Sequence, residues 1–214
     1  MQNTKETILE LKLAELQFRL ATTVRLAISL GKQSLEVPTS WSHGKHTVTY
    51  EEIVLTKDQA DIAADYLKRT ATYLMSLTIK DALKRTYGDP KNHDNENVVA
   101  AYQISRLIRN AFAHSPIRPM WHIDSDCREK IFTIKDVISL DTTGLDQKPF
   151  DWRHYGGLLA LFRLSKFVRV DFLGDTDTGK NRSIPKPKRE IIQQGNLILD
   201  QIDKLPGNLK KADL

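Results

Sequence analysis

Residues 97–116, which read NVVAAYQISRLIRNAFAHSP, constrain the fold of this 214-residue chain more than any other stretch. The apolar side chains recur at steps of three and four residues, the period of a helix with one buried stripe. Pro116 disfavours helical backbone at Ser115, so we expect the helix to end at about His114. The predicted buried stripe comprises Val99, Ile104, Leu107, Ile108, Ala111 and Phe112.

Polar residues follow the opposite side of the same predicted helix. Tyr102, Arg106, Asn110 and His114 each lie four residues after the last, so they share one face. Arg109 lies at the edge of that face. Five residues separate it from His114, about 140° of rotation on an ideal helix, so the two side chains diverge unless the last turn unwinds. With that unwinding, an arginine, an amide and a histidine converge at an accessible helix end.

Two more long helices precede this one. Residues 4–31 form an amphipathic pattern that Gly31 can end. The sequence TKDQ at 56–59 is a capping box that opens a helix reaching Tyr87, before the break GDP. Asp94 or Asn95 can cap the helix that follows. The stripe expected in the first helix comprises Ile8, Leu9, Leu11, Leu16, Leu20, Val24, Ala27, Ile28 and Leu30.

The segments between the helices suggest short strands. Residues 32–55 read as a loop with short strands, because HTVTY alternates, although TYEE at 49–52 also fits a capping box. After the third helix, residues 120–123 and 130–134 resemble two strands around a turn at 124–128, and residues 137–140 a third.

A fourth helix is expected to begin at Asp151 or Trp152. It is apolar nearly all round, which favours a place at the bundle centre or in a subunit contact, and Gly156 and Gly157 would permit close approach of another helix. The predicted fold is therefore mainly α: a helical bundle over residues 1–173 with a β-excursion at about 119–140. A linker at 174–187 and a C-terminal helix and tail at 188–214 follow.

Composition limits the classes of function. A hydrophobic fraction of 40% and a charged fraction of 28% are typical of a soluble globular protein. Apolar runs are shorter than the roughly 20 residues that cross a bilayer, and the start lacks signal-peptide features, so we expect no membrane association. The single cysteine, Cys127, favours the reducing cytoplasm. The net charge of +5 is compatible with a polyanionic partner.

The six residues Arg109-Asn110-Ala111-Phe112-Ala113-His114 resemble the signature of the HEPN superfamily, an arginine followed after four to six residues by a histidine. A polar residue commonly follows that arginine, and Asn110 supplies it here. The resemblance covers roughly residues 1–173. It implies a metal-independent endoribonuclease without cofactors, usually a homodimer that brings two motifs together across a shared cleft. Many relatives are toxins or antiviral effectors, which adds a cognate antitoxin to the expected partners.

The chemistry of these residue types agrees with RNA cleavage. RNA is cut when its 2′-hydroxyl attacks the adjacent phosphate, leaving a 2′,3′-cyclic phosphate and a 5′-hydroxyl. Histidine titrates near neutrality and moves the proton, and arginine holds the phosphate charge. We assign His114 as general base or acid, Arg109 as phosphate clamp and Asn110 as orienter. Tyr102 and Arg106 are candidates for binding RNA along the same face.

Other interpretations of the motif remain open. The chain is alternatively a non-catalytic HEPN-like module that binds RNA, a nucleotide or a protein partner, or a purely structural bundle in which His114 only faces the helix dipole. Two metal sites are conceivable, the pair His43 and His46 and the turn residues 122–127, but turn chemistry explains the second more simply. Gly174 to Lys180 hints at a phosphate loop without the Walker spacing.

Overall fold

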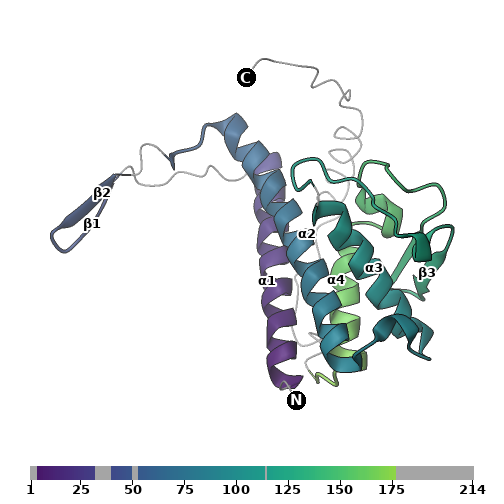
Figure 1. Cartoon of the computed structure of the whole chain (residues 1–214). Helices are drawn as coiled ribbons and strands as arrows, with labels where there is room; N and C mark the ends of the chain where they lie inside the picture. Colours follow the sequence, from purple (N-terminus) through teal and green to yellow (C-terminus); the bar gives the residue numbers. More distant parts are fainter. Residues whose placement is uncertain (1–3, 32–39, 50–52, 114, 177–214) are drawn as a thin grey trace, which may run out of the picture. The chain divides into compact units, whose positions relative to one another are not determined.

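The computed structural model describes residues 4–31, 40–49, 53–113 and 115–176, which belong to one compact unit. Its helices are α1 (Thr4–Ser29), α2 (Lys57–Tyr87), α3 (Glu96–Ala113) and α4 (Leu158–Phe167) (Figure 1). Two small antiparallel strand pairs complete the unit, so the prediction of a mainly α fold with a β-excursion is confirmed. The predicted C-terminal helix and most of the predicted linker lie outside the described residues.

Local signals place the ends of α2 and α3 where the sequence predicts them. At the start of α2, the Thr56 hydroxyl accepts from the Gln59 backbone amide at 3.3 Å, and the Gln59 side chain accepts from the Thr56 amide at 2.9 Å. Gly88, at φ +70°, ends α2. The Asn95 side chain accepts from the amide of Asn97 at 2.9 Å and caps α3. The last residue of α3 is Ala113, in agreement with the predicted stop before Pro116.

The buried stripe predicted for α1 is largely wrong, although its member Leu11 is buried. The side that faces the bundle consists of Thr7, Leu11, Ala14, Glu15, Phe18 and Ala21. Leu9, Leu16 and Leu20 of the predicted stripe are instead 52–63% exposed. The helix carries apolar residues on two opposite sides, and the side with small alanines around Leu11 and Phe18 packs on α2 and α4. On α3, Val98 is buried and Val99 is only partly buried, a shift of one residue from the predicted stripe.

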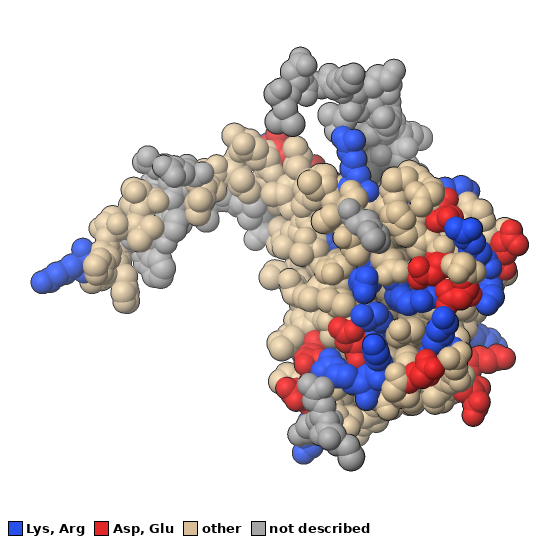
Figure 2. Space-filling view, viewed as in Figure 1, with Lys and Arg blue, Asp and Glu red and all other residues tan. Residues whose placement is uncertain are grey.

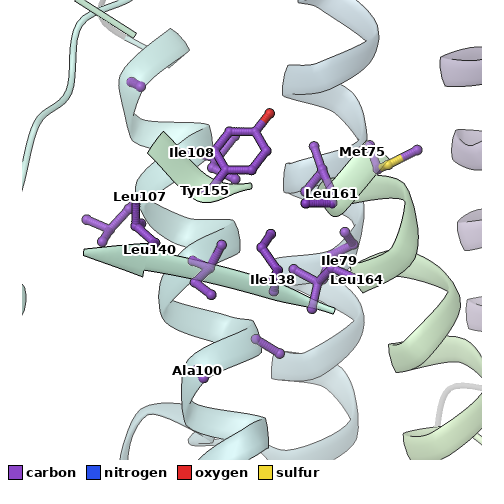
Figure 3. Close-up of a cluster of buried hydrophobic side chains, with 14 of the residues drawn as sticks. Met75, Ile79, Ala100, Leu107, Ile108, Ile138, Leu140, Tyr155, Leu161 and Leu164 are labelled. Atoms are coloured by element: carbon purple, nitrogen blue, oxygen red, sulfur yellow. The ribbon is translucent and has the colours of Figure 1, made fainter. Parts of the chain in front are cut away.

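The core lies between α2, α3, α4 and strand β4 (Ile138–Asp141). Figure 3 shows side chains from these elements meeting, among them Ile79 of α2, Ile108 of α3 and Leu161 of α4. All three are fully buried. Because α3 packs on α2 and against the strands, it is buried on most sides, which leaves few positions for exposed polar groups.

The strands pair differently from the prediction. Strand β3 (Ile131–Ile134) pairs with β4, and the predicted strand at 120–123 is wrong, because Met120 makes only an isolated bridge to Pro149. The Trp121 amide nevertheless donates to the Lys148 carbonyl at 2.9 Å, so this extended segment is held against residues 147–150. The first strand pair, β1 (Ser40–His43) and β2 (His46–Thr49), confirms short strands in the segment 32–55.

The fourth helix begins later than predicted. Asp151 caps a short 3-10 helix, η4 (Trp152–Tyr155), and α4 starts only at Leu158. Gly156 and Gly157 have φ angles of +93° and +91°, which L side chains rarely adopt, so they interrupt the helix. A Cβ atom on Gly157 would meet nothing within 4 Å. The two glycines therefore serve the backbone turn, and within the described residues no other helix lies against Gly157.

A buried ion pair joins α1 to the end of α4. The Arg169 Nε and Nη2 atoms donate to the two Glu15 carboxylate oxygens at 3.1 and 3.2 Å, and Ser165 donates to the same carboxylate at 3.0 Å. Arg169 lies in η5 (Val168–Phe172), a short π-helix that continues α4. Arg169 also pairs with Asp175, which Lys12 of α1 reaches at 3.1 Å.

We expect Glu15→Ala to lower the free energy of unfolding by about 3 kcal/mol, because it leaves the buried Arg169 without its main partner. The double variant Glu15→Leu/Arg169→Met should lose less than the sum of the two single replacements. Urea denaturation of all variants measures both effects. A cost below about 0.5 kcal/mol for Glu15→Ala would contradict the role of this pair.

Candidate functional site

A cluster of charged side chains lies where α3 meets the segment after it. Its members are Arg106, Arg109, Asn110, Asp124 and Asp126, which we call the α3 polar cluster. Figure 2 shows positive and negative side chains interspersed over the side of the molecule where α3 and β3 lie. Asp124 directly precedes η3 (Ser125–Cys127), and Asp126 lies within it. The chain forms this single 3-10 turn between Ile123 and β3.

Arg106 is the best-paired residue of the cluster. Its Nη2 atom lies 3.0 Å from both carboxylate oxygens of Asp126, and its Nη1 atom lies 3.3 Å from Asp124 Oδ2. Nη2 also lies 3.1 Å from the Cys127 sulfur. Because two carboxylates face one guanidinium, the charge of Arg106 is already compensated within the protein.

Asn110 connects Arg109 to the aspartates. The Asn110 Nδ2 atom donates to Asp124 Oδ2 at 3.2 Å, and its Oδ1 atom accepts from Arg109 Nη1 at 3.0 Å. Both ends of the amide are therefore engaged, so its orientation is fixed. A continuous chain of contacts runs from Arg106 through Asp124 and Asn110 to Arg109.

Arg109 differs from Arg106 in its charge balance. Arg109 is partly buried, and its Nε atom, like that of Arg106, is buried without a hydrogen-bond partner among the described residues. Within the same part of the chain, Arg109 forms no ion pair with a carboxylate, and its only side-chain bond is to the neutral Asn110. Arg109 is thus a partly desolvated, oriented cation whose charge is available to an external anion.

The surroundings hold Asp126 ionised and Cys127 protonated. The hydrogen bond from Lys91, at 2.7 Å, and the contacts from Arg106 lower the pKa of Asp126 from 3.8 to about 2. Burial raises the pKa of the Cys127 thiol above its usual 9.0, although Arg106 opposes this. Cys127 is therefore a poor nucleophile at neutral pH.

The structure brings together three of the five predicted site residues. Arg109 and Asn110 are in direct contact, and Arg106 joins them through Asp124. Tyr102 lies one turn before Arg106, partly buried against the core. His114 lies outside the described residues, so its predicted role stays a prediction.

Sequence reasoning missed the partners of the predicted site. The sequence predicts a turn or a metal site at Asp124 and Asp126, and it predicts no role for Lys91, because separations of 14–20 residues from α3 carry no sequence signal. In the described part of the chain, no group of three or more potential metal ligands is found. His43 and His46 lie opposite each other in the first strand pair. They offer two potential metal ligands, fewer than the four of a typical zinc site.

Comparisons of the chain with protein families, curated proteins and solved structures find no match. Within the described residues, none of the helices has both the length and the apolar character to cross a membrane. The geometry of the α3 polar cluster therefore has to carry the functional argument.

We expect Asp126→Asn to lower the free energy of unfolding by about 1 kcal/mol at pH 7, because this half-exposed carboxylate loses its pairs with Lys91 and Arg106. The folded-state pKa lies below the usual value, so the contribution is present above pH 3.8 and is lost as the pH falls through about 2. Urea denaturation from pH 7 down to pH 2 should show the difference from wild type shrinking. Asp94→Asn, at an exposed position, is the control; an undiminished difference at low pH would contradict the assignment.

Proposed function

We propose that the chain is a HEPN-like, metal-independent endoribonuclease that cleaves RNA through attack of its own 2′-hydroxyl. The single observation that carries this proposal is the state of Arg109, an oriented and partly buried guanidinium without a carboxylate partner among the described residues. Such a group is suited to the charge that builds on a phosphate in the transition state.

The roles follow from the contacts. Arg109 holds the phosphate, and Asn110 fixes the direction of its guanidinium. Arg106 acts through Asp124 and is a positioning residue, which differs from the RNA contact predicted from sequence, because its own charge is compensated. His114 supplies the proton transfer, one residue beyond the end of α3. The products carry 2′,3′-cyclic phosphate and 5′-hydroxyl ends.

The test is RNA cleavage by purified protein in EDTA. We expect Arg109→Ala to lower the cleavage rate by about 100- to 1,000-fold, the usual effect of removing one transition-state donor. Arg109→Lys should be only partly active, because an ammonium group lacks the planar paired donors. His114→Ala should be inactive, and Asn110→Ala should lie between wild type and Arg109→Ala.

Arg128→Ala is the matched control, since Arg128 is exposed and pairs with Asp146, outside the α3 polar cluster. Equal cleavage by all variants would indicate a contaminating nuclease and reject the site. Binding of RNA without cleavage by wild type would favour the alternative function, a non-catalytic RNA-binding module of the same fold.

The proposal includes pairing of two copies, supported by the exposed side of α1. Leu9, Leu13, Leu16 and Leu20 are 52–63% exposed and follow each other at steps of four, three and four residues. This is the spacing of a helix seam that packs on another helix. Figure 2 shows few charged side chains along α1. Because α2 packs against both α1 and α3, pairing through this leucine stripe differs from the arrangement that the resemblance implies, in which the two motifs share one cleft.

We expect Leu13→Glu and Leu16→Glu to convert a dimer into a monomer without unfolding it, because both side chains are exposed in the single chain. Sedimentation at micromolar concentration and circular dichroism measure the two properties. Gln17→Glu, an exposed neighbour outside the stripe, should stay dimeric. A wild-type monomer would reject the pairing.

Two further parts of the proposal rest on sequence alone. A cytoplasmic location is suggested by the single cysteine of the sequence. A cognate antitoxin is suggested only by the resemblance of the motif. Co-purification of a second protein with His114→Ala, expressed from the native locus, tests the antitoxin.

A further inference from the structure

A pocket of about 370 Å³ opens beside the last turn of α3. Two arginines and two aromatic rings are among its lining residues, Arg69 from α2, Arg118 from the loop after α3, Phe150, and Trp152 from η4. Pro119, Met120 and Pro149 complete the lining. None of these residues belongs to the α3 polar cluster.

Two residues of the pocket wall contact the HEPN-like motif at residues 109–114. The Met120 amide donates to the Ala111 carbonyl at 3.2 Å, and the Phe150 ring packs edge-on against Phe112 with centroids 4.7 Å apart. Ala111 and Phe112 directly follow Asn110. The pocket and Arg109 are thus attached to the same two turns of helix.

Arg69 is held in place, and Arg118 is available. Arg69 Nε lies 2.8 Å from Asp65 Oδ2, and its Nη1 atom donates to the Ile117 carbonyl at 2.8 Å. These contacts fix the guanidinium at the pocket wall and tie the loop after α3 to α2. The guanidinium of Arg118 is exposed, and it forms no hydrogen bond or ion pair with any described residue. The pocket therefore presents positive charge toward solvent.

A lysine ammonium group lies over the ring of Trp152. The Lys68 Nζ atom lies 4.1 Å from the centroid of the Trp152 ring, and Phe150 packs edge-on against it at 5.8 Å. The indole Nε1 atom is buried without a hydrogen-bond partner in the described part of the chain. An aromatic ring beside arginines is the kind of surface on which single-stranded bases stack.

We propose that this pocket binds one unpaired nucleobase of RNA together with its phosphate. The aromatic rings take the base and Arg118 takes the phosphate, while Arg69, paired with Asp65, holds the wall of the pocket. A volume of about 370 Å³ is at the small end of ligand pockets, which suits one nucleotide and not a duplex. The inference rests on the proposed function for the identity of the ligand as RNA, and it adds the base subsite that the motif alone lacks.

Binding is measured separately from cleavage with two probes. One is a fluorescent 2′-O-methyl RNA oligonucleotide, which lacks the attacking hydroxyl, followed by anisotropy. The other is 5′-AMP, followed by tryptophan fluorescence and compared with inorganic phosphate. We expect Arg118→Ala and Trp152→Phe each to weaken oligonucleotide binding by about 10-fold, the scale of one base contact.

The exposed Arg128→Ala should bind as wild type does, and circular dichroism checks the fold of each variant. 5′-AMP should change the fluorescence of wild type and of Arg109→Ala at similar concentrations, and that of Arg118→Ala only at about 10-fold higher concentration. Unchanged affinity in both pocket variants would overturn the proposal, as would equal responses to 5′-AMP and phosphate. Nucleotide binding at Trp152 in a protein that cuts no RNA would instead reject the nuclease and keep the site.

Discussion

The pairing of Arg106 with Asp124 and Asp126 is the interaction on which the rest of the site depends. It fastens the turn η3 to the side of α3, and it engages the carboxylates of both Asp124 and Asp126. Since Asp124 is also the acceptor for Asn110, the same pair sets the direction of the amide that holds Arg109. The charge of Arg106 is thus balanced by carboxylates, whereas Arg109 is oriented by Asn110 and keeps an unbalanced positive charge. An unbalanced, oriented guanidinium is suited to binding a phosphate.

The segment between α3 and α4 forms the surroundings of that helix end. After α3, residues 119–121 run back along residues 147–150 and bring Phe150 against Phe112. The β3–β4 pair then packs on the other side of α3, where Leu140 enters the core. The excursion is therefore part of the bundle, and it supplies the aspartates of the α3 polar cluster as well as the aromatic rings of the pocket.

The sequence predicted what is decided locally and missed what is decided by packing. The ends of α2 and α3 follow from a capping box, Asn95 and Pro116, each within a few residues of its effect. The buried side of α1 was wrong because small alanines around Leu11 and Phe18 face the bundle and four leucines do not. For the site, the contact of Arg109 with Asn110 joins neighbours in sequence, whereas Asp124 meets α3 only through the fold.

The central claim is that Arg109, and not Arg106, receives the phosphate. Side-chain nitrogen NMR of the arginines during titration with an uncleavable 2′-O-methyl RNA tests it directly. The account predicts that the Arg109 Nε–H signal shifts and saturates with RNA, because that guanidinium has no carboxylate partner among the described residues. The Arg106 signal stays in place, because its Nη atoms are already paired with Asp124 and Asp126. A shift of Arg106 with Arg109 unchanged, in a protein that binds the RNA, would contradict it.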